Sequence, residues 1–242
     1  MEKNYATKFV VIFVVIIIYA SIIFPKIPLY SQSRDCSPMD LAIALDNTGS
    51  LEDAIDNIKL ELSIIINDAK SKLGGDLRLG YITFKDDVTV HHSLTSDLSG
   101  VEASIIATTV SGGNRVPEAS NEAKNTAINN LAARPGQNGD FTTPWHGDDN
   151  GTQILILITD ALPGGFDDTK DQKDITMMND VANIALKNNI SIYDVYVPTG
   201  DDFGQRAILE QDANISKGSL INTTKDGKGT SDAIKEILKE QC

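Results

Sequence analysis

Positive charge is scarce in this sequence of 242 residues, which holds 21 Lys and Arg against 34 Asp and Glu. The formal net charge is -13 at pH 7. Nucleic acid is a disfavoured partner, because binding to its phosphates depends on clustered basic side chains. Cations and basic protein surfaces are better candidates, although acidity can also serve only to keep an exported domain soluble.

Common catalytic signatures are missing as well. The chain has no Gly-x-Ser-x-Gly elbow, no His-Glu-x-x-His pair and no phosphate-binding loop. It also has no sequence repeat of about 20–50 residues and no low-complexity tract, so solenoid and linker-rich architectures are disfavoured. With 41% hydrophobic and 23% charged residues, the chain can bury the core of one ordinary domain, and its length leaves room for an appendage.

Cysteine occurs only twice, and the two positions are informative. Cys36 and Cys242 bracket the whole globular region. In an oxidising compartment this arrangement predicts one disulfide that ties the ends of the domain together. Two unpaired thiols are the alternative, and they fit poorly with export.

One long apolar run lies near the N-terminus. Residues 9–24 are apolar apart from Tyr19 and Ser21, and Lys3 and Lys8 precede them. At about 1.5 Å per residue, a helix of this length falls short of a hydrocarbon layer of about 30 Å, but flanking residues can close the gap. An uncleaved membrane anchor is favoured over a signal peptide, because small residues suited to cleavage lie far beyond the run.

The charges around the apolar run predict how the chain is placed. The two lysines favour a cytoplasmic position for residues 1–8, so everything after residue 30 faces outward. Residues 25–35 hold two prolines and small polar side chains, which is typical of a linker. Residues 36–242 then form one domain, anchored to the membrane or secreted if residues 9–24 are cleaved.

Hydrophobic periodicity predicts alternating strands and helices in this domain. The predicted strands are 39–46, 77–84, 88–94, 154–158, 190–197 and 219–223. The predicted helices are 51–73, 101–110, 119–133, 175–186, 205–214 and 231–238. This order predicts an α/β fold with a doubly wound, mostly parallel, Rossmann-like sheet and helices on both faces.

Two predicted central strands end in aspartate, at Asp46 and Asp160. In open parallel sheets, ligands bind at the carboxyl ends of the strands where the winding reverses. The first strand continues Asp46-Asn47-Thr48-Gly49-Ser50, so one carboxylate and two hydroxyls at alternate positions can point at a common spot. Hard cations such as Mg²⁺, Mn²⁺ and Ca²⁺ prefer oxygen ligands of this kind.

The stretch 46–50 resembles the Asp-x-Ser/Thr-Gly-Ser signature of the metal-ion-dependent adhesion site in von Willebrand factor type A (VWA) and integrin I domains. Two companion motifs follow in the expected order. Residues 112–118, Gly-Gly-Asn-Arg-Val-Pro-Glu, look like the glycine-rich second loop of that family, and residues 156–160, Ile-Leu-Ile-Thr-Asp, look like its strand ending in Thr-Asp. The resemblance covers residues 38–242 and implies the VWA fold.

By this resemblance, five residues would form the shell of a divalent cation: Asp46, Thr48, Ser50, Glu118 and Asp160. Mg²⁺ is the first choice, with Mn²⁺ and Ca²⁺ as alternatives. One coordination position would then accept a carboxylate from a partner protein. The second loop lacks the threonine ligand of many I domains, so Glu118 is chosen, with Thr108 or Thr109 as poorer substitutes.

Plainer interpretations exist for several of these residues. Asp46 can cap the following helix, and Asp160 can hydrogen-bond the turn at 162–165. His91 and His92 are adjacent in a predicted strand, so their side chains face opposite sides and do not easily share a metal.

The long polar loop 134–151 offers two further possibilities. Trp145 and His146 are candidate contacts for a partner protein, although Trp145 can equally fix the loop to the domain. A second cation site is the other possibility, but a solvated loop is favoured over it; its ligands would be Asp140, His146, Asp148 and Asp149.

The predicted function is therefore that of an extracytoplasmic VWA domain that binds a protein ligand through a divalent cation and catalyses no reaction. A passive interaction module with an empty metal site is the first alternative. A hydrolase with Asp46 as nucleophile is less favoured, because such phosphatases usually carry a second aspartate two residues on, where this chain has Thr48.

Overall fold

The computed structural model describes residues 38–73, 76–113, 117–146, 151–167 and 169–241. The predicted membrane segment 9–24, the linker 25–35, Cys36 and Cys242 lie outside these ranges, so the predictions made for them stay predictions. Within the described ranges, no helix is long and apolar enough to cross a membrane.

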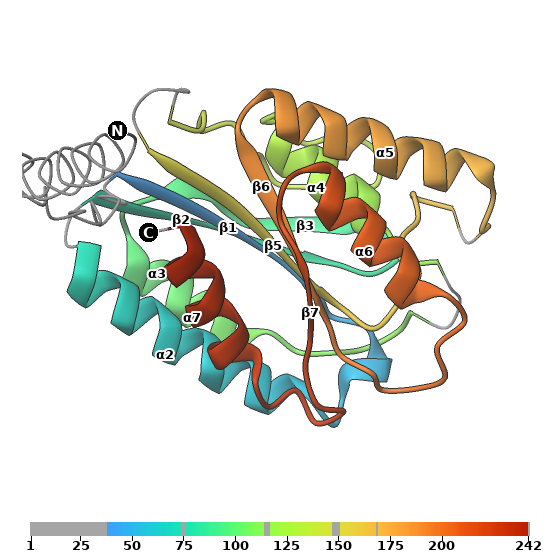
Figure 1. Ribbon diagram of the computed structural model, residues 1–242, viewed down its shortest axis with the longest axis horizontal. Helices are drawn as coiled ribbons and strands as arrows, with labels where there is room; N and C mark the ends of the chain where they lie inside the picture. Colours follow the sequence, from blue (N-terminus) through green and yellow to red (C-terminus); the bar gives the residue numbers. More distant parts are fainter. Residues whose placement is uncertain (1–37, 74–75, 114–116, 147–150, 168, 242) are drawn as a thin grey trace, which may run out of the picture. The chain divides into compact units, whose positions relative to one another are not determined.

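The described part of the chain contains one seven-stranded sheet in the order β4-β3-β2-β1-β5-β6-β7 (Figure 1). Its strands are β1 (Met39–Asp46), β2 (Leu77–Phe84), β3 (Val88–Thr95), β4 (Gln137–Asn138), β5 (Thr152–Thr159), β6 (Ile190–Tyr196) and β7 (Leu220–Asn222). All neighbours pair in parallel except β2 and β3, which are antiparallel. The prediction of a mostly parallel sheet is confirmed, and β4 is a short strand inside the segment predicted as loop.

Helices cover both faces of the sheet, as predicted. They are α2 (Ile55–Leu73), α3 (Leu98–Ala107), α4 (Ser120–Ile128), α5 (Gln172–Lys187), α6 (Gln205–Ile215) and α7 (Thr230–Gln241). Figure 1 shows α2, α3 and α7 on one face and α4, α5 and α6 on the other. Two apolar clusters, one on each face, fill the space between the helices and the sheet.

The central strands β1 and β5 are buried on both faces, which explains their nearly continuous apolar sequences. Leu41, Ile43 and Leu45 of β1 belong to the cluster beneath α2, α3 and α7. On the opposite face the apolar residues of β1 are Ala42 and Ala44, which share a cluster with alanines of α4. Small side chains on both elements let α4 pack close to the sheet.

The predicted element boundaries differ from the structure mainly at helix ends. The helix predicted from residue 51 begins at Ile55, because Gly49–Leu51 first forms a 3-10 turn. The helix predicted over 101–110 spans Leu98–Ala107 instead. Its start is fixed by Asp97, whose side chain accepts a hydrogen bond from the backbone nitrogen of Gly100.

Candidate metal centre

The carboxylate of Asp46 lies at the end of β1 and is fully buried. Its Oδ1 accepts hydrogen bonds from the backbone nitrogen of Thr48 at 2.9 Å and from Thr48 Oγ1 at 2.7 Å. Its Oδ2 accepts a hydrogen bond from Thr159 Oγ1 at 2.6 Å. Because Thr159 ends the neighbouring strand β5, Asp46 is held from two adjacent strand ends.

The contacts continue from Thr48 to Asp160 without a break. Thr48 Oγ1 lies 2.8 Å from Ser50 Oγ, and Ser50 Oγ donates to Asp160 Oδ1 at 3.0 Å. Thr199 Oγ1 donates to the other oxygen of Asp160. Ser50 is exposed and Asp160 half-buried, so the cluster is open to solvent on one side.

The hydroxyl hydrogens of Thr48 and Ser50 are too few for these contacts. When Asp46 and Asp160 are both ionised, the hydroxyl groups of Thr48 and Ser50 provide the only two hydrogens for three short contacts between oxygens. These contacts are Thr48–Asp46, Thr48–Ser50 and Ser50–Asp160. One contact then joins two oxygens with no hydrogen between them. Oxygens converge in this way around a bound cation, so the arrangement fits one.

The glycine-rich second loop packs directly against the first. Gly49 donates from its backbone nitrogen to the carbonyl of Gly112 at 3.0 Å. Gly113 has a φ of 65°, and a Cβ added there would lie 2.3 Å from Thr48 Cγ2 and 2.9 Å from Glu118 Oε1. Only glycine fits between these two side chains.

Glu118 reaches the same region through backbone pairing with the loop that follows β5. Its nitrogen donates to the carbonyl of Leu162 at 3.1 Å, and Gly164 donates to the carbonyl of Glu118 at 2.8 Å. The Glu118 residue is 1% exposed. The three loops that carry the predicted ligands are thus joined to one another by hydrogen bonds.

The surroundings of Asp46 disfavour its ionised form. Burial, and next the charge of Asp160, raise the pKa of Asp46 to about 7, against the lowering effect of hydrogen bonds from Thr159 and Thr48. A cation placed among these oxygens would offset both causes. The donor set consists of carboxylate and hydroxyl oxygens, which suits Mg²⁺, Mn²⁺ or Ca²⁺.

The candidate site combines hydroxyl oxygens with carboxylate oxygens. Within the described residues, no three acidic, His or Cys side chains lie close enough together to hold a metal ion. The candidate site therefore depends on the hydroxyl groups of Thr48 and Ser50 as much as on its carboxylates.

The alternative ligands, Thr108 and Thr109, precede the second loop and have other contacts. Thr108 Oγ1 lies 2.6 Å from the hydroxyl of Tyr81 and donates to the carbonyl of Ser104 at 3.0 Å. The backbone carbonyl of Thr109 accepts a hydrogen bond of 3.4 Å from Asn47 Nδ2 of the first loop. Glu118 is thus the better-placed candidate of the three.

Thr159 and Thr199 were missed by the sequence analysis. Both bind carboxylate oxygens of the cluster, on Asp46 and on Asp160 respectively. The Thr-Asp motif at the end of β5 contains Thr159 and is the sequence signal for this residue. Thr199 follows β6 in the chain and carried no local signal.

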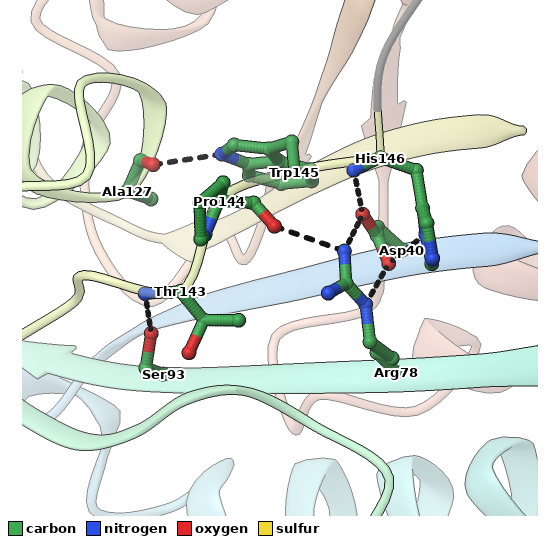
Figure 2. A network of polar contacts seen from close by, with 8 residues as sticks. All are labelled: Asp40, Arg78, Ser93, Ala127, Thr143, Pro144, Trp145 and His146. Carbon is green, nitrogen blue, oxygen red and sulfur yellow. Dashed lines mark hydrogen bonds and ion pairs between the residues drawn. The ribbon is translucent and has the colours of Figure 1, made fainter. Parts of the chain in front are cut away.

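Figure 2 shows Trp145, and His146 beside Asp40. Asp40 lies near the start of β1, whereas Asp46 ends that strand. His146 donates from its backbone nitrogen to Asp40 Oδ2 at 2.6 Å, and its Nδ1 lies 2.8 Å from Asp40 Oδ1. Arg78 also binds both Asp40 oxygens, at 2.8 and 2.6 Å. Trp145 Nε1 donates to the carbonyl of Ala127 at 2.8 Å, which fixes the loop to α4.

This arrangement separates Trp145 and His146 from the candidate metal centre. Asp40 stands near the start of β1 and Asp46 at its end, a span of about 20 Å at roughly 3.3 Å per residue. A partner side chain bound to a cation at Asp46 would therefore be too far away for its immediate neighbours to contact Trp145 and His146. A separate partner contact at Trp145 and His146 stays a prediction.

The second cation site considered in loop 134–151 gains no support from the described residues. Asp140 Oδ1 accepts a hydrogen bond from the backbone nitrogen of Ala133 at 2.7 Å, and His146 is engaged by Asp40. Asp148 and Asp149 lie outside the described residues.

The adjacent histidines on β3 also turn to different partners. His91 Nε2 lies 2.9 Å from Thr83 Oγ1, and its ring stacks on Tyr81 with centroids 5.1 Å apart. His92 Nε2 lies 2.8 Å from Ser104 Oγ. The two rings therefore do not form a shared site.

The fold and the site together define a class of protein. It is a doubly wound α/β domain with an oxygen cluster at the carboxyl ends of its central strands. Comparison with solved structures makes this specific: the domain has the VWA fold. The sequence itself matches no family model and no curated protein.

Three solved structures illustrate the likeness. BatB from Bacteroides thetaiotaomicron is 17% identical, with a TM-score of 0.56, covering 84% of this chain and 98% of its own. The vWF domain of the type V pili tip protein Mfa5 from Porphyromonas gingivalis is 11% identical, with a TM-score of 0.58, covering 85% and 96%. A VWA protein from Catenulispora acidiphila is 13% identical, with a TM-score of 0.61, covering 85% and 43%. Identities this low establish the fold alone.

Proposed function

We propose that this chain presents a VWA domain outside the cytoplasm and binds a protein ligand through a divalent cation. The observation that carries the proposal is the unbroken series of contacts from Asp46 through Thr48 and Ser50 to Asp160, in which the hydroxyl hydrogens are too few once both carboxylates are ionised. Such a set of oxygens, buried at one end and open to solvent at the other, suits a cation that a partner can reach.

Each proposed ligand has a distinct part. Asp46 and Asp160 would supply negative charge, and Thr48 and Ser50 neutral oxygens. Glu118 would add a third carboxylate, directly or through water. This addition tightens cation binding and weakens the pull of the cation on an acidic ligand, because more of the positive charge is already neutralised.

The bound cation would supply a positive centre for a carboxylate of the partner protein. Mg²⁺ is the first choice, and Mn²⁺ or Ca²⁺ would also suit the donor set. The protein contributes the fixed positions of the oxygens, through the hydrogen bonds that join its three loops. The surrounding loops would decide which partner is accepted.

We further propose that residues 9–24 anchor the chain in a membrane with residues 36–242 outside. The apolar run after two lysines supports this, as does the likeness of the fold to a protein at the tip of a pilus. A bridge between Cys36 and Cys242 would suit that compartment.

A catalytic function fits Asp46 poorly. Its carboxylate is fully buried, and both oxygens accept hydrogen bonds from Thr48 and Thr159. A nucleophile has to reach an incoming substrate, which these contacts oppose. VWA domains are usually interaction modules, and this chain is best assigned to that class.

A passive interaction module is the second candidate, and one observation favours it. Asp160 is already bound by Ser50 and Thr199, so the cluster holds its shape through its own hydrogen bonds. In that case partner binding would be indifferent to the cation.

A peptide-selection experiment separates these two candidates. A random peptide library is selected on the domain in Mg²⁺ and again in chelator, with Asp46→Asn as the variant. The proposed function expects peptides with an acidic residue at a fixed position, retained in Mg²⁺ and lost in chelator or in the variant. Equal retention with and without chelator would establish the passive module instead.

A further inference from the structure

Three ionisable side chains lie inside the apolar layer between the sheet and the helices α4, α5 and α6. Lys124 comes from α4, Asp194 from β6 and Asp212 from α6, and each is 0% exposed. None of them belongs to the candidate metal centre. Charged side chains are rarely buried this completely unless they are paired or serve a purpose.

The backbone directs all three side chains into the same layer. Side chains alternate along β6, so Asp194 faces the same way as the residues two positions before and after it. The apolar cluster on this face includes near neighbours of each: Ala123 and Ala127 on α4, Ile192 and Tyr196 on β6, and Leu209 and Ala213 on α6. The charged groups are therefore surrounded by aliphatic and aromatic surface.

Lys124 Nζ is in contact with Asp212 Oδ2 as a buried ion pair. Asp194 lies within hydrogen-bonding reach of Asp212. Two carboxyl groups can bond each other only when one of them carries a proton. Burial, and next the charge of Asp212, raise the pKa of Asp194 well above its ordinary value, so the proton resides on Asp194.

The ion pair is poorly compensated by its surroundings. Taking both charges out of water is costly, and the cost is recovered only when the remaining lone pairs are also satisfied. Within the described residues, no amide, hydroxyl or ammonium group donates to either oxygen of Asp194 or to Asp212 Oδ1, so the proton shared by the two carboxyl groups is the only one there. A reaction that removes the two charges without moving the backbone would remove this cost of burial.

We propose that Lys124 and Asp212 are joined by an amide bond between their side chains, and that Asp194 is the acid that catalyses its formation. Such a reaction needs three conditions. An amine must contact a carboxyl group, a proton donor must lie beside that carboxyl group, and bulk water must be absent. The described residues provide all three.

The reaction balances without any added reagent. The ammonium of Lys124 passes one proton to the carboxylate of Asp212, which gives a neutral amine and a neutral acid. The nitrogen lone pair attacks Cγ of Asp212 to form the C–N bond, while Asp194 protonates the former carbonyl oxygen and takes a proton from nitrogen. Asp194 then protonates one hydroxyl, the C–O bond breaks with its electron pair on oxygen, and water leaves. The remaining hydroxyl returns its proton to Asp194 and becomes the carbonyl oxygen of the amide.

The products are a neutral amide, one water molecule and Asp194 with its proton restored. The two opposite charges of Lys124 and Asp212 have disappeared from the apolar layer. Asp194 can then donate its proton to the oxygen of the new amide. Hydrolysis is suppressed because the bond lies where the side chains are 0% exposed.

Such a bond would tie α4 to α6 and close a loop between residues 88 positions apart. The tie would persist after unfolding and so restrict the unfolded chain. It would strengthen a module exposed to pulling forces or proteases. The proposal does not depend on the candidate metal centre, and either can fail without the other.

Mass spectrometry of the purified, full chain tests the proposal. After denaturation and trypsin digestion, we expect cleavage at Lys124 to be blocked, because an acylated lysine is not a trypsin site. Peptide 207–217, released by cleavage after Arg206 and Lys217, should appear joined to the peptide that contains Lys124, with a mass lower than the sum by one water molecule. Separate peptides with cleavage after Lys124 would overturn the proposal.

Two variants test the chemistry, each checked for folding by circular dichroism. Asp212→Asn should reach the same cross-linked mass as the wild type, by losing ammonia instead of water. Asp194→Ala keeps both bonding groups and should remain largely unlinked; complete linkage in it would overturn the catalytic role of Asp194. If either variant fails to fold, the digest of the wild-type chain still decides whether the bond exists.

Discussion

Ser50 Oγ donates a hydrogen bond of 3.0 Å to Asp160 Oδ1, across 110 positions of sequence. The contact joins the loop after β1 to the end of β5, two strands that pair in parallel through Leu45 and Ile158. It completes the series of oxygens that begins at Asp46. The proposed cation binding depends on this junction.

Replacing Thr48 by valine removes one hydroxyl and keeps a side chain of similar shape. We expect Mg²⁺ affinity to fall about tenfold or more, because Asp46 and Ser50 both lose their contact with that hydroxyl. Thr48→Ser is the matched control and should bind nearly as well as the wild type. Calorimetric titration of both variants gives the comparison, and equal affinities would remove Thr48 from the site.

Gly113→Ala should disrupt the contact between the second loop and the first. The new Cβ would lie 2.3 Å from Thr48 Cγ2 and 2.9 Å from Glu118 Oε1. Gly112→Ala is the matched control, since its φ of 74° is also positive but its Cβ would meet nothing closer than 3.9 Å. We expect both variants to lose some stability and only Gly113→Ala to lose most cation affinity.

Cation binding should strengthen as the pH rises toward and above 7. In the folded protein without cation, burial and Asp160 raise the pKa of Asp46 from 3.8 to about 7. Between pH 3.8 and about 7, Asp46 holds its proton in the folded state but has lost it in the unfolded state. The free energy of unfolding therefore decreases as the pH rises through this range. A cation that competes with that proton should therefore raise Tm more at about pH 8 than at about pH 5.5.

The variant Asp46→Asn serves as the control for this pH effect. It lacks the titrating carboxylate, so Mg²⁺ should not raise its Tm at either pH. Without cation, its stability should fall less between the two pH values than that of the wild type. A Tm increase by Mg²⁺ that is independent of pH and present in the variant would show binding elsewhere.

Arg78→Met should destabilise the domain without affecting the candidate metal centre. The substitution leaves the fully buried Asp40 without its bidentate partner, at a cost of about 3 kcal/mol, the lower end for a broken buried pair, because Arg78 is partly exposed. Denaturant unfolding measures the loss. Mg²⁺ affinity of the folded variant should equal that of the wild type, since the two regions lie at opposite ends of β1.

Strands and their ends were the most predictable part of this fold. An apolar run that ends at Asp46 or Asp160 predicts two things: that the strand is central and buried, and where its carboxyl end lies. β1 and β2 have the predicted bounds, because burial on both faces leaves one pattern only. Helix starts were less predictable, since the 3-10 turn at Gly49–Leu51 looks helical in sequence.

Contacts between distant loops could be predicted only in part. The resemblance to VWA domains placed Asp46, Thr48 and Ser50 near Asp160, and the structure brings these four side chains together. It could not indicate Thr199, because that contact depends on how the loop after β6 folds over the sheet. Whether the assembled group binds a cation stays a prediction.

The partner contact predicted at Trp145 shows the same limit. A tryptophan in a polar loop attracts notice in sequence, but sequence does not indicate which end of the sheet the loop reaches. In the structure Trp145 donates to the carbonyl of Ala127 and packs near Phe141, with ring centroids 6.4 Å apart. These contacts favour the plainer alternative, in which the side chain fixes the loop.

The most direct test is calorimetric titration of Mg²⁺, Mn²⁺ and Ca²⁺ into the folded protein, with two variants of equal net charge. Asp46→Asn removes the carboxylate at the end of β1, and Asp53→Asn removes an exposed carboxylate a few residues later. The account predicts saturable binding by the wild type and by Asp53→Asn, and none by Asp46→Asn. Absence of binding by the folded wild-type protein, or equal binding by Asp46→Asn, would contradict it.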